Sequence, residues 1–318
     1  MRAKRERIGV VVASIVMSAL TSVPVAARPS GGALPPELVK VVRVAGRDGV
    51  PADAALVAAN VTVVGPAGPG YVTVYACDAD FPATSNVNYL ADQVVPNLVL
   101  SRISADGTIC VATSEVTDVI VDVAGYVPAG AAVVPLEAPV RALDTRSPGG
   151  PGSPLVAGSV TELRVAGRNG IPDDASVVMF NATAIAGPDP GYLTVYPCGS
   201  RPGTSSVNHL PGQVVPNLVT SRVSDDGTVC IYNLAAADVV VDLVAYATEG
   251  IVPLATPQRV VDTRDDGSVD PAGAVLRLDI TDRSDVPDDA TAAVYNLTSV
   301  DATAPGYATS YPCDVGRP

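Results

Sequence analysis

The stretch Gly70-Tyr71-Val72-Thr73-Val74-Tyr75-Ala76-Cys77 is the first of three related copies in the chain. It returns at 191–198 as GYLTVYPC and at 306–313 as GYATSYPC, after 121 and 115 residues. In the first copy Tyr71, Thr73 and Tyr75 alternate with Val72 and Val74. This period of two residues is that of a β-strand. A repeat of about 120 residues has the size of a whole domain rather than of a solenoid unit. The chain is therefore predicted to consist of tandem β-domains.

Outward from this stretch, further elements keep their order and spacing. Asn-x-Thr triplets precede it at Asn60, Asn181 and Asn296, and we interpret them as structural hydrogen-bonding positions rather than glycosylation acceptors. Asp-Gly hairpin signals and an apolar closing strand (119–123 and 239–243) follow it. Clusters of Gly, Pro, Asp and Asn separate the short strands. The predicted fold class is all-β, with tandem antiparallel β-sandwich modules of jelly-roll type; a small barrel is the alternative topology.

The repeats set the expected domain boundaries. We assign residues 1–27 to a signal peptide, 28–133 to the first module, 134–250 to the second and 251–318 to a partial third module. The third copy contains only the first half of the pattern, since a partner for Cys313 would lie about 32 residues further on. We expect either that the chain is a fragment of a longer protein or that the third module is completed by something else.

The first 27 residues are typical of an export signal. Arg2, Lys4, Arg5 and Arg7 precede an apolar run at 8–20, and small residues suggest cleavage after Ala27. A membrane anchor is the alternative, but the apolar run is short for a span and is followed by proline. No later stretch has the length of a membrane-spanning segment. The sequence thus predicts a secreted protein, extracellular or associated with the cell wall, with no membrane span after cleavage.

Composition narrows the function. The 318 residues include one histidine, no tryptophan, 28 glycines and 29 prolines, and the formal net charge is −13. An acidic protein repels nucleic acid, so nucleic acid is not an expected partner. A single histidine cannot supply repeated catalytic triads or a His-rich metal site. We expect no enzymatic activity, no cofactor and no metal site. Where the first module has Tyr89 the second has His209, which suggests a surface or stacking position.

Four of the five cysteines occupy matching places in the two full copies. Cys77 and Cys110 are 33 residues apart, and Cys198 and Cys230 are 32 apart. In an exported chain this pattern favours one disulfide within each module. A zinc site would need a different ligand spacing. Cys313 is then expected to be a free thiol.

Charged residues in matching places suggest structural ion pairs. Asp122 and Asp242 lie inside apolar strands and need partners, for which Arg102 and Arg222 are candidates. In the second module Asp144 and Arg146 belong to an Arg-x-x-Asp-Thr-Arg stretch, 141–146, which recurs at 259–264. These residues are expected to hold a turn, with a wall of a ligand site as the alternative. The carboxylates crowded at 262–270 leave open whether Ca²⁺ binds that loop.

Tyrosines form matched pairs along one strand face. Tyr71 and Tyr75 in the first module correspond to Tyr192 and Tyr196 in the second. Aromatic rows on a β-sandwich can stack on sugar rings, and they can also pack the sheet against loops. These four residues are the candidate glycan-stacking positions.

The motifs GYxTVYPC, Asp-Gly-x-x-Cys, VDVxGY (121–126) and RxxDTR resemble a repeat module found in secreted and cell-surface proteins of high-GC Gram-positive bacteria. The resemblance covers nearly all of residues 37–318 and implies a bacterial, extracellular setting rather than an activity. Two departures are evident. The first module lacks the RxxDTR opening, and Val244-Ala245-Tyr246 in the second module replaces the Val-x-Gly-Tyr ending.

Three functions remain from the sequence. The first is a non-enzymatic, exported repeat protein for adhesion or glycan binding, with a cell-wall polysaccharide or surface glycan as partner; repetition of weak sites would raise avidity. The second is a structural spacer or stalk of the cell envelope. The third is a secreted hydrolase that uses paired carboxylates, for which no distinctive recurring pair is present.

Overall fold

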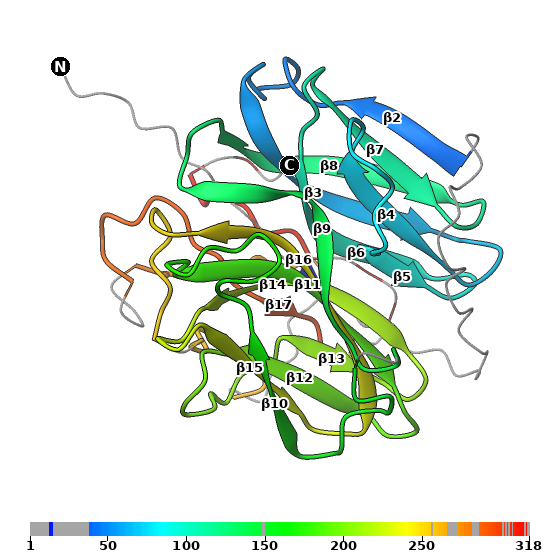
Figure 1. Cartoon of the computed structure of the whole chain (residues 1–318), viewed down its shortest axis with the longest axis vertical. Coiled ribbons are helices and arrows are strands. Elements are labelled where there is room, and N and C mark those ends of the chain that lie inside the picture. The colour runs from blue at the N-terminus through cyan, green and yellow to red at the C-terminus, as the bar shows by residue number, and fades with distance from the viewer. Residues whose placement is uncertain are drawn as a thin grey trace.

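The computed structural model shows an all-β protein (Figure 1). It describes residues 13–14, 38–147, 150–255, 257–265, 273–281, 286–300, 302, 304, 306, 308–314 and 316. No α-helix occurs among these residues, and the strands of the two full copies form four antiparallel sheets. In the same part of the chain no helix has the length and apolar character of a membrane-spanning helix.

The strands between residues 39 and 128, which we call module 1, form two sheets. One has the order β2-β7-β4-β5, with β2 at Val39–Arg43, β7 at Thr108–Thr113, β4 at Gly70–Ala76 and β5 at Val87–Tyr89. The other has the order β6-β3-β8, with β6 at Val94–Arg102, β3 at Ala54–Val64 and β8 at Asp118–Pro128. A valine-rich core fills the space between them, because alternate residues such as Val61, Val63, Val72 and Val74 point inward.

The strands between residues 133 and 247, which we call module 2, repeat this plan with one strand more. One sheet has the order β10-β15-β12-β13, with β10 at Ser159–Arg164, β15 at Thr228–Asn233, β12 at Gly191–Tyr196 and β13 at Val207–His209. The other has the order β14-β11-β16-β9, with β14 at Val214–Arg222, β11 at Val177–Ala186, β16 at Ala237–Ala247 and β9 at Val133–Asp144. Phe180 is fully buried in the core between them.

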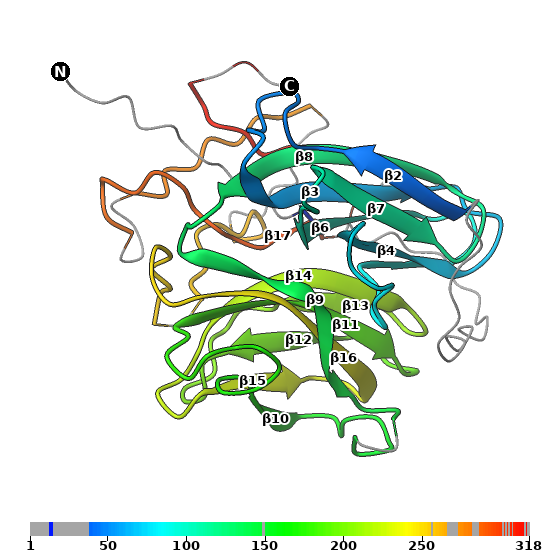
Figure 2. The same cartoon turned by 45° about the horizontal axis from the view of Figure 1, so that its top comes forward.

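The two modules pack against each other through the outer faces of β3 and β11. Leu56, Ala58 and Leu98 of module 1 form one apolar cluster with Val177 and Met179 of module 2. Strands β3 and β11 are thus buried on both faces, which explains why they are apolar at successive positions outside their Asn-x-Thr triplets. Figure 2 shows the strands of module 1 above those of module 2. This arrangement is compatible with the predicted tandem sandwich.

Asparagines join the modules at the same interface. The amide Nδ2 of Asn97 donates to the backbone oxygen of Asn86 and to Oδ1 of Asn181, at 2.7 and 2.8 Å. The amide of Asn181 in turn donates to the backbone oxygen of Ser85 at 2.9 Å. The same contacts recur one copy later, where Asn217 bonds to Asn296 at 3.0 Å. Each Asn-x-Thr asparagine also donates to its own threonine, so these triplets do form structural hydrogen bonds.

The third copy differs from the sequence prediction. Its described residues contain one strand, β17 at Leu297–Thr298, which pairs in parallel with β1 at Ala13–Ser14 inside the predicted signal peptide. The expected strand at 306–313 is absent from the described residues there. In module 2 the equivalent strand β12 lies between β15 and β13, and counterparts of those two neighbours are missing from the described third copy. An extended strand is not stable without neighbouring strands to accept and donate its backbone hydrogen bonds.

Both modules contain the disulfide that the cysteine spacing predicts. Cys77 is bonded to Cys110 and Cys198 to Cys230, which ties the end of β4 to β7 and the end of β12 to β15. Cys313 is free and exposed.

Candidate functional site

The tyrosine pairs divide into one partly exposed and one buried member. Tyr71 and Tyr192 are half-buried, whereas Tyr75 and Tyr196 are 8% and 3% exposed. The ring of Phe81 meets Tyr75 edge to face at 5.5 Å, and burial raises the pKa of the Tyr75 hydroxyl. The prediction that all four rings could stack on sugars is therefore wrong for Tyr75 and Tyr196. Phe81, in the segment that follows β4, packs against Tyr75.

Module 2 places three side chains together on the outer face of its β12–β15 pair. Successive residues of β12 alternate between faces, so Leu193 and Val195 enter the core while Tyr192 stays outside. Tyr232 lies opposite Thr194 on β15, and its ring is 6.0 Å from that of Tyr192 at an angle of 46°. We call Tyr192, Tyr232 and Arg201 the aromatic platform.

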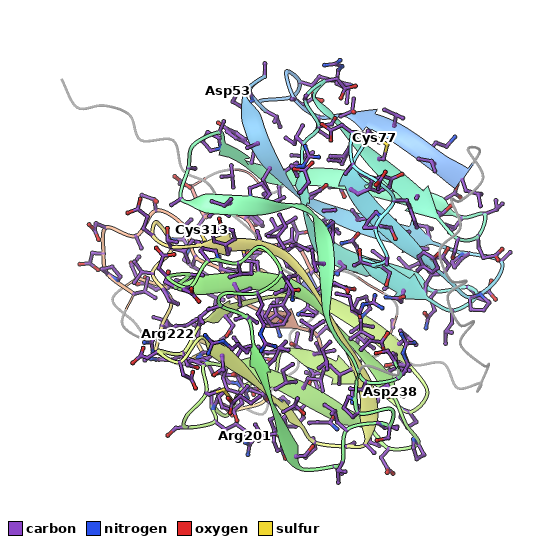
Figure 3. The ribbon with its side chains drawn as sticks, in the orientation of Figure 1. Asp53, Cys77, Arg201, Arg222, Asp238 and Cys313 are labelled. Atoms are coloured by element: carbon purple, nitrogen blue, oxygen red, sulfur yellow. A yellow bond between two sulfur atoms is a disulfide. The ribbon has the colours of Figure 1, made fainter. Side chains whose placement is uncertain are left out.

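Arg201 completes this platform from the loop after β12. Its guanidinium carbon lies 4.1 Å from the centre of the Tyr232 ring, and Nη1 contacts the hydroxyl of Tyr192 at 3.5 Å. A guanidinium over an aromatic face is a favourable arrangement, and this one leaves donor groups near solvent because Arg201 is exposed (Figure 3). The platform thus combines aromatic rings with hydrogen-bond donors.

The repeat does not duplicate the platform. Register places Ala112 in module 1 where module 2 has Tyr232. The matching loop sequences, 81–85 and 201–205, place Phe81 where module 2 has Arg201. Tyr232 and Arg201 were not predicted as site residues, because the first copy does not share them. The available signal was Tyr232 itself, which lies two residues after Cys230, where the first copy has Ala112.

An open hollow of about 360 Å³ lies beside the end of β12. Its lining includes the loop 197–200, Arg222 and Asp225. Arg222 Nη2 donates to Asp225 at 3.1 Å, and both side chains are well exposed. The hollow is polar and shallow, and it adds charged groups near the platform loop.

The buried carboxylate Asp242 has a different partner from the one predicted. Arg141 of β9 binds it through two nitrogens, at 2.7 and 3.1 Å, and also contacts Asp144. Arg222 cannot reach it, because Arg222 lies opposite Val177 on β11 whereas Asp242 lies opposite Asn181, four residues along the strand. Burial raises the pKa of Asp242, and the hydrogen bonds from Arg141 oppose that rise.

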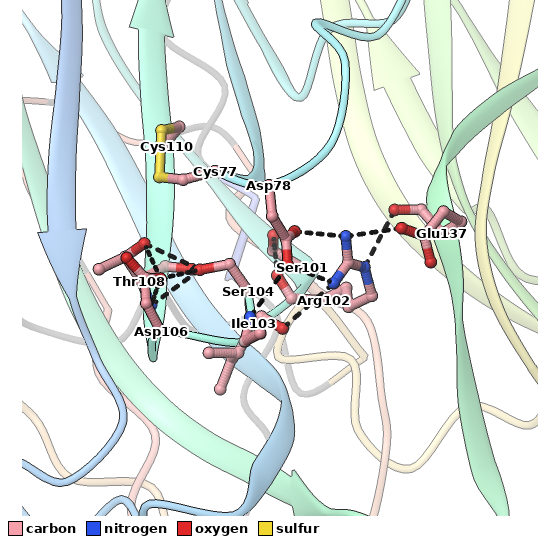
Figure 4. A network of polar contacts seen from close by, with 11 residues as sticks. Cys77, Asp78, Ser101, Arg102, Ile103, Ser104, Asp106, Thr108, Cys110 and Glu137 are labelled. Atoms are coloured by element: carbon pink, nitrogen blue, oxygen red, sulfur yellow. Dashed lines mark hydrogen bonds and ion pairs between the residues drawn. A yellow bond between two sulfur atoms is a disulfide. The ribbon is translucent and has the colours of Figure 1, made fainter.

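The same register separates the predicted pair in module 1. Arg102 lies opposite Leu56 and Asp122 opposite Asn60. Arg102 instead binds Asp78 at 2.5 Å and Glu137 at 2.9 Å, as Figure 4 shows. Asp122 is exposed. The predicted contact between Asp144 and Arg146 is present at 2.9 Å. Burial raises the pKa of the Asp144 carboxyl, but the hydrogen bonds from Arg146 outweigh this effect and keep that pKa lowered.

His209 is a buried residue rather than a surface one. It is 2% exposed, and neither ring nitrogen has a hydrogen-bond partner among the described residues. Burial lowers its pKa. A Cβ on Gly191 would come within 2.9 Å of its ring, so the glycine of the repeated GYxTVY motif makes room for the imidazole.

The acidic loop is only partly described. Asp262 binds Arg259 and Arg264, each at 2.7 Å, and Asp266 and Asp270 lie outside the described residues. In the described part of the chain no group of three or more His, Cys, Asp or Glu side chains is arranged to hold a metal ion.

Comparison with protein-family models, with curated proteins and with solved structures finds no match to this chain.

Proposed function

We propose that the chain is a non-enzymatic, exported repeat protein that binds a glycan of the cell wall or of another surface through the aromatic platform of module 2. The supporting observation is the cluster of Tyr192, Tyr232 and Arg201 on an outer sheet face. The two disulfides are consistent with an oxidising, extracellular location.

The chemistry of the platform suits a saccharide. A tyrosine face accepts the apolar C–H side of a sugar ring, while the exposed guanidinium donates to hydroxyl or carboxylate oxygens. Arg201 favours an anionic or uronic-type glycan at this place, because the exposed guanidinium is a local positive charge on a protein whose net negative charge otherwise repels anions. The site is shallow, so it suits an internal segment of a long polysaccharide rather than an enclosed monosaccharide.

A direct binding measurement tests the proposal. Purified chain is titrated with soluble cell-wall polysaccharide in a calorimeter or on a glycan array. We expect Tyr192→Ala, Tyr232→Ala and Arg201→Ala each to weaken binding by about three- to tenfold. The matched control is Tyr71→Ala, which changes the equivalent tyrosine of module 1, where Ala112 and Phe81 replace the rest of the platform.

The control also defines the contradicting result. Equal losses in Tyr71→Ala and Tyr192→Ala, or unchanged binding in all platform variants, would remove the platform from glycan recognition. Lack of binding to every polysaccharide tested would favour the second candidate, a structural spacer of the envelope. The apolar cluster and asparagine contacts that join the modules support that candidate.

A further inference from the structure

Equivalent strands of the two modules have different neighbours. In module 2, β16 lies between β11 and β9. In module 1, the equivalent strand β8 pairs with β3, and no strand of the described chain pairs with its other side. The added strand β9 is what distinguishes the two sheets.

Strand β9 supplies specific side-chain partners to β16. Arg141 binds Asp242, and the hydroxyl of Thr145 donates to Asp238 at 2.6 Å. The contact extends past the strand end. The backbone nitrogen of Thr145 donates to the backbone oxygen of Val239 at 3.1 Å, and the backbone nitrogen of Val239 donates to the Thr145 hydroxyl at 3.0 Å. The residues of β16 are almost all buried as a result.

Module 1 keeps the receiving residues without this strand. Asp118 and Asp122 stand at the places of Asp238 and Asp242. Ile120 and Val123 of β8 are 48% and 44% exposed, whereas their counterparts Val240 and Leu243 are 4% and 0% exposed. An exposed, apolar strand edge with unpaired backbone groups is a template for another strand.

The chain contains a second copy of the missing strand. Residues 251–264 match 133–146, and the shared residues are Val252, Pro253, Leu254, Pro257, Arg259, Asp262, Thr263 and Arg264. The described residues of this segment belong to no strand. Upstream of β2 the sequence has no Arg-x-x-Asp-Thr-Arg stretch.

The charged residues of segment 251–264 already have the arrangement found in β9. Arg259 Nη1 donates to Asp262 at 2.7 Å, as Arg141 donates to Asp144 at 3.0 Å. Arg264 chelates Asp262 through Nε and Nη2, as Arg146 chelates Asp144. Only the partner across the sheet differs, because Arg141 also reaches Asp242.

We propose that segment 251–264 of one chain adds to the open edge of β8 in a second copy of this chain. The β9–β16 register then places Arg259 on Asp122 and Thr263 beside Asp118. A second copy is the occupant because the segment lies against module 2 of its own chain. Arg259 Nη2 contacts the backbone oxygen of Gly203, and Ala255 lines the hollow next to Arg222.

The assembly that results is directional. The donor segment and the acceptor edge are different surfaces of the chain, so the contact is heterologous and each bound copy presents a new free edge. Strand addition of this kind uses backbone hydrogen bonds for affinity and side-chain contacts for register. The product is a head-to-tail series of chains.

A charge exchange tests the contact in the full chain. Sedimentation or light scattering over a wide concentration range is expected to show concentration-dependent growth of the unaltered chain. Asp122→Arg or Arg259→Asp alone should weaken association by about 30-fold or more, because each leaves like charges facing in the added pair. The double variant, Asp122→Arg with Arg259→Asp, should recover association. Arg168→Asp changes an exposed arginine of module 2 and should associate like the unaltered chain.

Hydrogen exchange supplies a second measurement. Backbone amides on the open side of β8 should exchange rapidly in dilute solution and become protected on association. A monomer at every concentration would overturn the proposal, even if the segment folded back within one chain. Association that persists in both single variants, or that leaves β8 unprotected, would also overturn it. None of these outcomes depends on glycan binding.

Discussion

Asn97 of module 1 donates to the side-chain oxygen of Asn181 in module 2, at 2.8 Å, in the middle of the apolar contact between the modules. The Oδ1 of Asn97 simultaneously accepts from the backbone nitrogen of Leu218 at 3.1 Å. Both polar atoms of the Asn97 side-chain amide thus form hydrogen bonds across the interface between the modules. The Asn97 side chain sets the position of one module on the other.

Removing this amide should destabilise the folded chain. Asn97→Ala leaves the amide of Leu218 and the carbonyl of Asn86 without their partner, which costs about 2–3 kcal/mol of unfolding free energy. The control is Asn60→Ala, since Asn60 donates to Thr62 within its own strand and is partly exposed. Urea unfolding followed by circular dichroism compares the two. Equal losses would show that the contact between the modules contributes nothing beyond the local bond.

A matched pair of aspartates tests the effect of the added strand. Asp242→Ala leaves Arg141 without its buried partner and should cost about 3–5 kcal/mol. Asp122→Ala changes the equivalent, exposed residue and should stay within about 0.5 kcal/mol in dilute solution. Both values come from chemical unfolding under the same conditions. A large loss in Asp122→Ala would mean that β8 is already covered in the single chain.

The only histidine predicts a pH-dependent stability. The pKa of His209 is lowered by burial, so the unfolded chain takes up a proton at a higher pH than the folded chain. The free energy of unfolding is therefore highest above the pKa of histidine in the unfolded chain, about 6.5. It decreases as the pH falls from there toward the lower pKa of His209 in the folded chain. Urea midpoints measured from pH 7.5 to 5 should fall for the unaltered chain.

The control for this prediction is His209→Tyr, which introduces the residue that module 1 has at Tyr89. Its urea midpoint should stay nearly constant over the same pH range. If both chains lose stability equally, the pH dependence comes from carboxylates instead.

The disulfides should stabilise each module separately. Replacing Cys198 and Cys230 by alanine opens a loop of 32 residues and should lower stability by about 3–4 kcal/mol. Cys313→Ser alters a free, exposed thiol and should have little effect. Thermal unfolding with and without reductant provides the measurement. An equal effect of reductant on the alanine variant and the unaltered chain would contradict the assignment to this bond.

The sequence predicted the all-β class and both disulfides, because these depend on local alternation and on cysteines that recur in place. It failed for Asp122 and Asp242, since pairing depends on register between strands, and the strands place Arg102 and Arg222 four residues away. It also could not show that Tyr75 and Tyr196 are buried. The aromatic platform was not predicted, because the first copy has Ala112 and Phe81 in place of Tyr232 and Arg201.

The position of the disulfides has a mechanical consequence for a protein pulled from its ends. Each bridge closes a loop of 33 or 32 residues, and that loop cannot lengthen while the sulfur bond is intact. Each loop would otherwise add about 110 Å of extended chain. The bridges therefore shorten the reach of a stretched molecule by about 220 Å and confine unravelling to the strands outside them.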